Sequence, residues 1–283
     1  MATPDLSLID QGTATAIIAN YALLKAQVYE RVEAAVKGHW FRAEHYDRDD
    51  IERIANEIIP LVQAGQKSIS QLTALYLDTV LTAGTAVPLG AGSQTIGDSD
   101  LPTLRGVSPS EEFLRAGITI WTALKDGDAY EAAVKKGLDR LVSLVTTDVQ
   151  LAQRWTENRV LNLSEAKFWR RVPRGVGSCA LCVLASTQRY HVRDLKPIHP
   201  GCQCTVAPII LRNGRAAQFD PGRILNEPLL EQLHKDIGSF AGGYDRGGRA
   251  PSYKDILIRE HGELGPVLTW RDQHFTGPDS LAA

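Results

Sequence analysis

The sequence predicts an α+β protein with a mainly α-helical N-terminal body, a small α+β module and an extended C-terminal tail. Three observations support this prediction. Apolar residues recur at three- and four-residue steps through much of the first 165 residues, as in amphipathic helices. All four cysteines of the 283-residue chain then fall within one window of 26 residues. Beyond this window the chain becomes rich in glycine and loses its helical periodicity.

Three helices are expected between about Ser7 and Gly84. The first carries an apolar stripe made of Ile17, Ile18, Tyr21, Leu24, Val28, Val32 and Val36. The run Asp47–Asp50 offers N-cap residues for a second helix, in which Pro60 is expected to introduce a kink. A third helix is expected from Ser68 to Leu81, with Gly84 as its C-cap.

Residues 85–108 are rich in Gly, Pro, Ser and Asp, and they predict a long loop or mobile arm. The sequence SPSEEFLRAG restarts the helical pattern, with Ser108 or Ser110 as the N-cap. Two more helices are expected, from Asp128 to about Leu144 and from Thr146 to Arg170.

These patterns divide the chain into three parts. Residues 1–165 form the helical domain, which includes the loop 85–108. Residues 166–215 form the cysteine-containing module, where the β-prone runs 205–207 and 209–211 predict short strands. Residues 216–283 form the extended tail.

The cysteine window reads CxxC followed by HxxCxC, with Cys179 and Cys182 in the first motif and His199, Cys202 and Cys204 in the second. Structural zinc takes four sulfur or nitrogen ligands in a tetrahedron, and closely spaced ligand pairs are typical of such sites. The pattern therefore predicts a zinc-stapled module, in which the bound metal stabilises a segment with few core residues. The spacing leaves open which four of the five residues bind the metal.

Two other chemistries remain open for the same residues. The cysteines could form disulfides, which require an oxidising compartment. Alternatively, Cys179 or Cys182 could act as a nucleophile with His191 or His199 as its base. Clustering of all four thiols favours metal ligation over one activated cysteine. The sequence contains no GxxxxGK[ST], HExxH or GxSxG motif.

The formal net charge of −2 hides an asymmetry between parts of the chain. Residues 151–215 carry eleven Lys and Arg against three acids, so this segment has a charge of +8 and the remainder −10. Such a split is typical of proteins that meet an anionic partner. Candidate nucleic-acid contacts lie in KFWRRVPRG, namely Lys167, Arg170, Arg171 and Arg174. The alternative is that Phe168 and Trp169 are core residues and the arginines are solvated.

The N-terminal sequence lacks the basic start and apolar run of a signal peptide, and no window reaches the ~18 apolar residues that span a bilayer. We therefore expect a soluble protein made in the cytosol, with reduced thiols and no membrane partner.

One stretch of sequence resembles a known family. FWRRVP at 168–173, CALC at 179–182, LAS at 184–186 and HPGCQC at 199–204, with Pro208 beyond, are similar to the MuF-like minor head proteins of tailed phages. This family is also called the phage head morphogenesis family. The ending HGELGPVLTWRDQHFTGP also resembles the ends of actinobacteriophage relatives. The chain departs from the family pattern at Gln203, where arginine is usual.

The resemblance implies a minor capsid protein present in few copies, inside the virion or at the portal vertex. Its partners would be the portal protein, other head proteins and packaged DNA. It would enter the head in the host cytoplasm and assist head assembly, DNA packaging or ejection. No small-molecule substrate and no enzymatic activity are expected. Two alternatives remain: a cysteine-type capsid maturation protease and a zinc-dependent nucleic-acid-binding protein.

Overall fold

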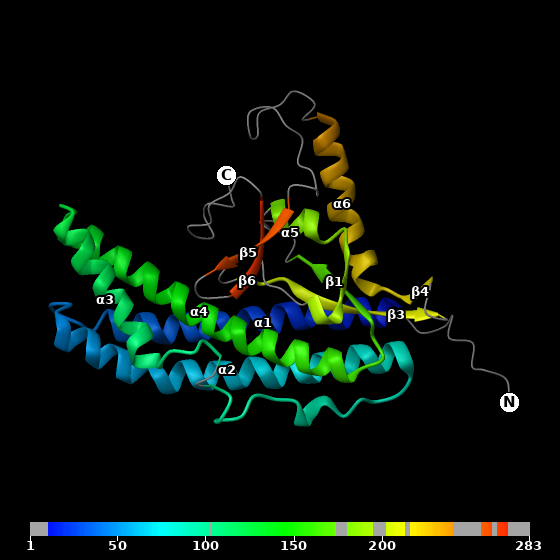
Figure 1. Cartoon of the computed structure of the whole chain (residues 1–283), viewed down its shortest axis with the longest axis horizontal. Helices are drawn as coiled ribbons and strands as arrows, with labels where there is room; N and C mark the ends of the chain where they lie inside the picture. The colour runs from blue at the N-terminus through cyan, green and yellow to red at the C-terminus, as the bar shows by residue number, and fades with distance from the viewer. Residues whose placement is uncertain are drawn as a thin grey trace. The chain divides into compact units, whose positions relative to one another are not determined.

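The computed structural model describes residues 11–101, 104–173, 180–194, 202–212, 216–239, 256–261 and 265–270 (Figure 1). These residues are mainly helical and include a small four-stranded antiparallel sheet, which confirms the α+β class. The chain forms two compact units. The helical unit comprises 23–73 and 94–156, and the sheet unit comprises 1–22, 74–93 and 157–283. This division differs from the predicted boundaries at 165 and 215.

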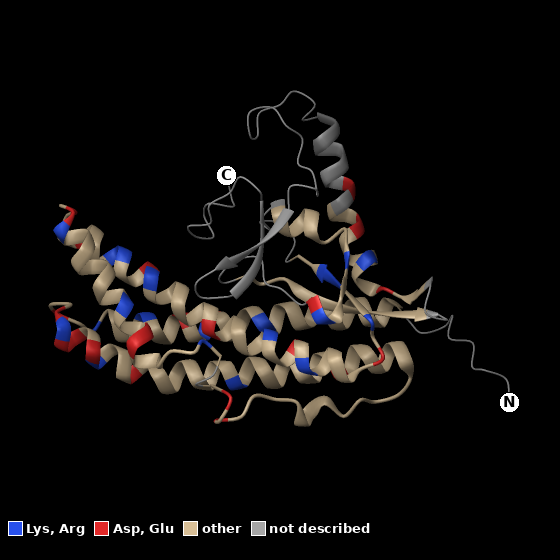
Figure 2. Cartoon of the chain, in the orientation of Figure 1, with Lys and Arg blue, Asp and Glu red and all other residues tan. Residues whose placement is uncertain are grey.

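Four long helices contribute to the helical unit: α1 (Gln11–Trp40), α2 (Arg48–Thr85), α3 (Pro109–Lys125) and α4 (Tyr130–Leu163). All four place apolar side chains in one core, which includes Val36, Trp40, Ile58, Phe113 and Leu144. Figure 2 shows Lys and Arg interspersed with Asp and Glu along these helices. The sequence pattern of an apolar inner face and a charged outer face therefore corresponds to a packed helical layer.

The second and third predicted helices are one helix, α2, with Pro60 inside it. Pro60 removes a helical hydrogen bond, but buried residues on both sides, such as Ile58 and Val62, belong to the same core and hold the helix together. The expected C-cap is also wrong, because Ala86, rather than Gly84, takes the left-handed conformation with φ 58°. A Cβ on Gly84 would lie 2.6 Å from Ile210 Cδ1, so glycine serves close packing at this position.

Helix α4 joins two segments that the sequence analysis separated near residue 145. Polar residues of this helix are nearly as buried as its apolar ones: Thr147, Asp148, Gln150, Gln153 and Thr156. Some find polar partners within the helical unit. Tyr29 Oη donates to Gln153 Oε1 at 3.2 Å, and Ser70 Oγ lies 2.7 Å from Thr156 Oγ1. Because these groups are hydrogen bonded, the helix can be buried on most sides.

The segment 86–108, expected to be a loop or mobile arm, is tied down at several described points. Asp78 Oδ1 accepts hydrogen bonds from the Leu89 and Ala91 amides, the latter in the short 3₁₀ helix η2 (Ala91–Ser93). Near the other end, the buried Arg105 side chain contacts Glu112 and Asp148 carboxylates, each at 2.7 Å. The described residues between α2 and α3 are therefore mostly loop, as predicted, and these contacts hold the loop near both ends.

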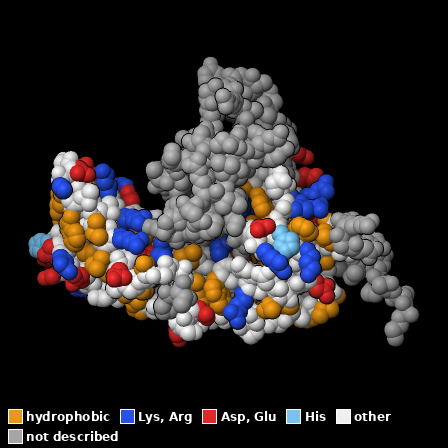
Figure 3. Space-filling model, in the orientation of Figure 1, with side chains coloured by type: hydrophobic (Ala, Val, Ile, Leu, Met, Phe, Trp, Pro, Cys, Tyr) orange, Lys and Arg blue, Asp and Glu red, His pale blue; other side chains and the backbone are white. Residues whose placement is uncertain are grey.

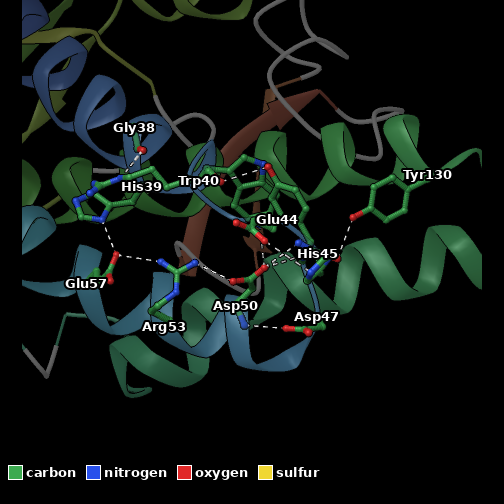
Figure 4. Close-up of polar contacts among 12 residues, drawn as sticks. Gly38, His39, Trp40, Glu44, His45, Asp47, Asp50, Arg53, Glu57 and Tyr130 are labelled. Carbon is green, nitrogen blue, oxygen red and sulfur yellow. Dashed lines mark hydrogen bonds and ion pairs between the residues drawn. The ribbon is translucent and has the colours of Figure 1, made fainter.

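The predicted N-caps of α2 and α3 are confirmed. Ser108 Oγ accepts from the Glu111 amide, and Asp47 Oδ1 accepts from the Asp50 amide. Asp50 also folds back on the α1–α2 turn, where its Oδ2 accepts hydrogen bonds from three successive amides, Glu44, His45 and Tyr46 (Figure 4). Arg53 Nη2 donates to the other oxygen at 2.8 Å. The Arg53 hydrogen bond first, and then the backbone amides, lower the pKa of Asp50 to about 2.

Asp50→Ala is expected to lower the free energy of unfolding at pH 7 by about 1–2 kcal/mol, because four hydrogen bonds in the α1–α2 turn are lost. The folded-state pKa of Asp50 lies below its usual value of 3.8. Its contribution is therefore complete above about pH 4 and disappears as the pH falls towards 2. Urea denaturation of the wild type and of Asp50→Ala from pH 2 to pH 7 measures how this contribution to the free energy of unfolding changes with pH. The exposed Asp49, changed to alanine, should keep the wild-type pH dependence; an Asp50→Ala curve parallel to wild type contradicts the assignment.

In the sheet unit, strand order is β2-β1-β3-β4, formed by β2 (Arg189–His191), β1 (Phe168–Val172), β3 (Thr205–Arg212) and β4 (Ala216–Phe219). All pairings are antiparallel, and Trp169 lies opposite Tyr190 on one side and Pro208 on the other. The two predicted β-prone runs are confirmed as one strand, β3. The prediction that the helix continues to Arg170 is wrong, because α4 ends at Leu163 and residues 168–172 form the strand β1.

The part predicted to be an extended tail, 216–283, contains β4, the helix α6 (Pro221–Ser239) and the hairpin of β5 (Ile256–His261) and β6 (Gly265–Trp270). The prediction of an extended tail is therefore wrong for these described segments. Among the described helices, none combines the length and apolar character needed to cross a bilayer.

Candidate metal centre

Three cysteine sulfurs lie together in the sheet unit. The Sγ atoms of Cys182, Cys202 and Cys204 are all within 4.8 Å of one another, and all three residues are buried. Among the described residues, these cysteines are reduced thiols. The structure therefore brings the second cysteine of CxxC to both cysteines of CxC, although 20 residues separate Cys182 from Cys202.

Two short segments position the sulfurs. Cys182 lies on the helix α5 (Ala180–Ala185), whose buried residues Leu181 and Ala185 belong to the same apolar cluster as the three cysteines. Cys202 and Cys204 lie on the segment that leads into β3. Because Thr205 at the start of β3 pairs with Val172 at the end of β1, this segment is held at one end of the central strand pair. The apolar surroundings exclude water from the sulfurs.

One sulfur–sulfur distance in the cluster matches the spacing of tetrahedral metal ligands. With zinc–sulfur bonds of about 2.3 Å, tetrahedral ligands stand about 3.8 Å apart. The Cys182 and Cys202 sulfurs are 3.9 Å apart. A disulfide requires sulfurs about 2.05 Å apart, so the described cysteines have metal-ligand spacing rather than bond spacing. Three buried cysteines are thus close enough to hold a metal ion.

Burial and mutual contact control the thiol chemistry of the cluster. A hydrogen bond with Cys182 lowers the pKa of the Cys204 thiol. A hydrogen bond with Cys202, burial and the charge of Cys202 outweigh it and raise this pKa to about 12. Cys204 is therefore protonated at neutral pH in the metal-free protein, and a buried, protonated thiol is a poor nucleophile. A bound metal cation displaces such protons, because it deprotonates the thiols that it coordinates.

Aromatic and cationic side chains surround the sulfurs. Tyr190 stacks on Trp169, with ring centroids 4.9 Å apart, and its hydroxyl donates to the Ala185 carbonyl at the end of α5. The Arg171 guanidinium lies over the Trp169 ring, with its carbon 5.2 Å from the ring centroid. Its Nη1 lies 4.0 Å from Cys202 Sγ, within reach of an N–H···S contact. Burial is the main cause of the raised pKa of Tyr190.

The remaining predicted ligands, Cys179 and His199, lie outside the described residues. His191, the other histidine considered as a base, lies on β2. Its Nδ1 accepts the Arg193 amide at 3.2 Å, and its ring packs edge-on against Phe168. Through these contacts His191 helps to hold β2 and the residues after it in place, which is a structural role.

Two of the four predicted nucleic-acid contacts are inside the fold. Arg170 forms two hydrogen bonds to the Asp220 carboxylate and donates to the Ser186 and Thr187 carbonyls. Arg171 is fully buried. The prediction that these two side chains contact phosphates is therefore wrong, since buried guanidiniums with internal partners do not reach a phosphate backbone. Lys167 is exposed, and Arg174 lies outside the described residues.

Two residues that the sequence patterns did not indicate, Asp220 and Asn226, bind β1 from α6 and its N-terminal boundary. Asn226 Nδ2 donates to the Arg171 carbonyl at 2.7 Å and to the Ser186 carbonyl at 3.3 Å, so it ties β1 to the end of α5. No short motif marks either residue. Only the expectation of a helix after residue 220 could have indicated Asp220 as its N-cap.

The fold and the site together define a class: an α+β protein whose sheet unit carries a buried, thiol-rich candidate metal centre. No family model, curated protein or solved structure matches the chain.

Proposed function

We propose that this chain is a minor head protein of a tailed phage, of the MuF-like type, and that zinc holds its sheet unit together. The observation that carries the proposal is the convergence of Cys182, Cys202 and Cys204, because these residues belong to the motifs that resemble the family. A shared metal explains why sulfurs from two separate motifs meet in one buried cluster.

Zinc is the proposed ion for chemical reasons. Thiolate sulfur selects soft or borderline cations, and a closed tetrahedral site without an open position is typical of structural zinc. The ion would supply stability rather than catalysis. Cys182, Cys202 and Cys204 would each bind it through Sγ as a thiolate.

The proposed role inside a phage head is assembly with other proteins, and exposed apolar side chains of the helical unit support it. Ile118 and Trp121 stand one turn apart on α3 and are 54% and 38% exposed. Figure 3 shows that hydrophobic side chains reach the surface in small groups between charged ones. Such groups suit contacts with the portal protein or other head proteins, which would bury them. The helical unit would make these contacts, while the zinc centre keeps the sheet unit folded.

The protease alternative has less support. The Cys182 side chain is buried, and its sulfur lies 3.9 Å from Cys202 Sγ within the cluster of three thiols. Rapid alkylation of one cysteine in the metal-loaded protein would favour that alternative.

Quantitative mass spectrometry of purified procapsids and filled heads tests the proposed role. The phage or prophage that encodes this chain provides the particles. We expect the chain in both kinds of particle, at a small fraction of the abundance of the major capsid protein, and we expect it to co-purify with the portal protein from the same genome. Particles that lack the chain, with the protein found only in the cell extract, contradict the proposal.

A further inference from the structure

The side chain of Arg171 reaches the cysteine cluster from β1. Its Nη1 is 4.0 Å from Cys202 Sγ, and its guanidinium carbon is 5.2 Å from the Trp169 ring centroid. Trp169 and Arg171 are two residues apart on one strand, so their side chains share a face of the sheet. The aromatic ring therefore supports the flat guanidinium from one side.

The backbone of Arg171 is also held by hydrogen bonds. Arg171 pairs with Val206 across β1 and β3, and its carbonyl accepts the Asn226 amide at 2.7 Å. Tyr190 stacks on Trp169 and donates to the Ala185 carbonyl on the helix that carries Cys182. Strand, tryptophan, arginine and cysteine helix are thus linked by described contacts. This arrangement keeps a permanent positive charge beside the sulfurs.

The charges of the centre explain what this arginine could do. A divalent cation coordinated by three thiolates leaves one negative charge in excess on the cluster. A guanidinium remains charged under all ordinary conditions, and it is less strongly hydrated than an ammonium, which suits burial. Charge-assisted hydrogen bonds to a metal-bound thiolate are stronger than those to a neutral thiol. Arg171 is therefore placed to stabilise the metal-bound form over the metal-free form.

We propose that Arg171 is the charge-balancing partner of the metal centre: it positions Cys202 and raises the affinity of the cluster for a thiophilic divalent cation such as Zn²⁺ or Cd²⁺. This inference rests on the proposed zinc centre. It assigns to Arg171 a role in metal binding in place of the predicted contact with nucleic acid.

Competition titrations with a chelating indicator test the inference on the full chain. Arg171→Gln and Arg171→Met are expected to lower Zn²⁺ affinity about 10- to 100-fold, the usual effect of losing an outer-shell partner. Arg171→Lys keeps the charge and should lose less than about 10-fold. The ultraviolet Cd²⁺–thiolate absorption band gives a second readout, because it reports bonds to sulfur and not overall stability. Arg193→Gln, which removes an exposed arginine of the same unit, should leave the affinity unchanged.

The outcomes separate the two proposals. Wild-type protein that binds neither Zn²⁺ nor Cd²⁺ overturns the zinc centre and this inference together. Wild-type protein that binds metal, with Gln and Met variants of equal affinity, overturns the role of Arg171 alone. Variants that fail to fold even with Zn²⁺ in large excess also overturn it, because Arg171 would then serve the fold rather than the ion.

Discussion

Cys202→Ser is expected to lower the apparent zinc affinity by more than about 100-fold, since loss of a ligand should outweigh the 10- to 100-fold effect of losing an outer-shell partner. Cys202 is fully buried, and its sulfur contacts both Cys182 and Arg171. A serine hydroxyl is a weaker zinc ligand than a thiolate and does not reach as far. The sheet unit should then lose most of the stability that metal binding contributes, which is on the order of 10 kcal/mol for structural zinc.

Urea denaturation with and without a chelator measures this effect. In wild-type protein we expect the chelator to lower the unfolding midpoint strongly, whereas in Cys202→Ser it should change little. Ser186→Ala is a matched control, because it removes a buried hydroxyl that donates to Val183 at the end of the same cysteine helix. It should cost about 1 kcal/mol in the metal-loaded protein, and the chelator should lower its unfolding midpoint as strongly as in wild type. A Cys202→Ser protein that still shows the full chelator effect contradicts the ligand assignment.

Asp220→Ala is expected to lower the free energy of unfolding by about 3–5 kcal/mol, because it leaves the Arg170 guanidinium buried without its carboxylate. Asp220 accepts from Arg170 Nε at 3.0 Å and Nη2 at 2.8 Å, and both side chains are less than a tenth exposed. Asp220 Oδ1 also accepts the Arg223 amide, so the N-terminus of α6 loses its cap.

A double-mutant cycle with Arg170→Met measures the interaction energy between Arg170 and Asp220. If the ion pair carries the effect, Asp220→Ala should destabilise the Arg170→Met background far less than the wild type. Asp220→Asn keeps a hydrogen-bond acceptor without the charge, and its effect should be intermediate. A loss below about 1 kcal/mol for Asp220→Ala would show that Arg170 is solvated. In that case Arg170 would again be available to contact nucleic acid.

The helical elements could be predicted because their apolar periodicity is local. The stripe from Ile17 to Val36 predicts α1, and Asp47 and Ser108 predict two helix starts that the structure confirms. The predicted separation of α2 into two helices before Ser68 and the predicted break near residue 145 were wrong for a common reason. Helix-breaking tendencies of a few kcal/mol are local, whereas the core packing that outweighs them comes from residues far away in sequence.

Strand β1 was also mispredicted because its structure depends on residues that are distant in sequence. Phe168–Val172 follows a long helical pattern, and only its pairing with β2 and β3 makes it a strand. That error had a consequence for the site. In a strand, Arg170 and Arg171 point to opposite faces, so one meets Asp220 and the other meets Cys202. Treated as a helix end, the same arginines were expected on a solvated or nucleic-acid-binding surface.

The sulfur cluster could be predicted from spacing alone, because short CxxC and CxC turns bring ligands close together at little conformational cost. Arg171, Asn226 and Asp220 could not. Their roles depend on sheet register and on a helix that begins 17 residues after Cys204, and the sequence between these elements specifies neither.

Metal content of the native, reduced protein tests the central claim most directly. Elemental analysis, together with mass spectrometry under non-denaturing conditions, should find about one zinc ion per chain, lost on chelation together with the fold of the sheet unit. A protein that is metal-free as isolated, takes up no Zn²⁺ and is fully folded would contradict the claim that these sulfurs share an ion.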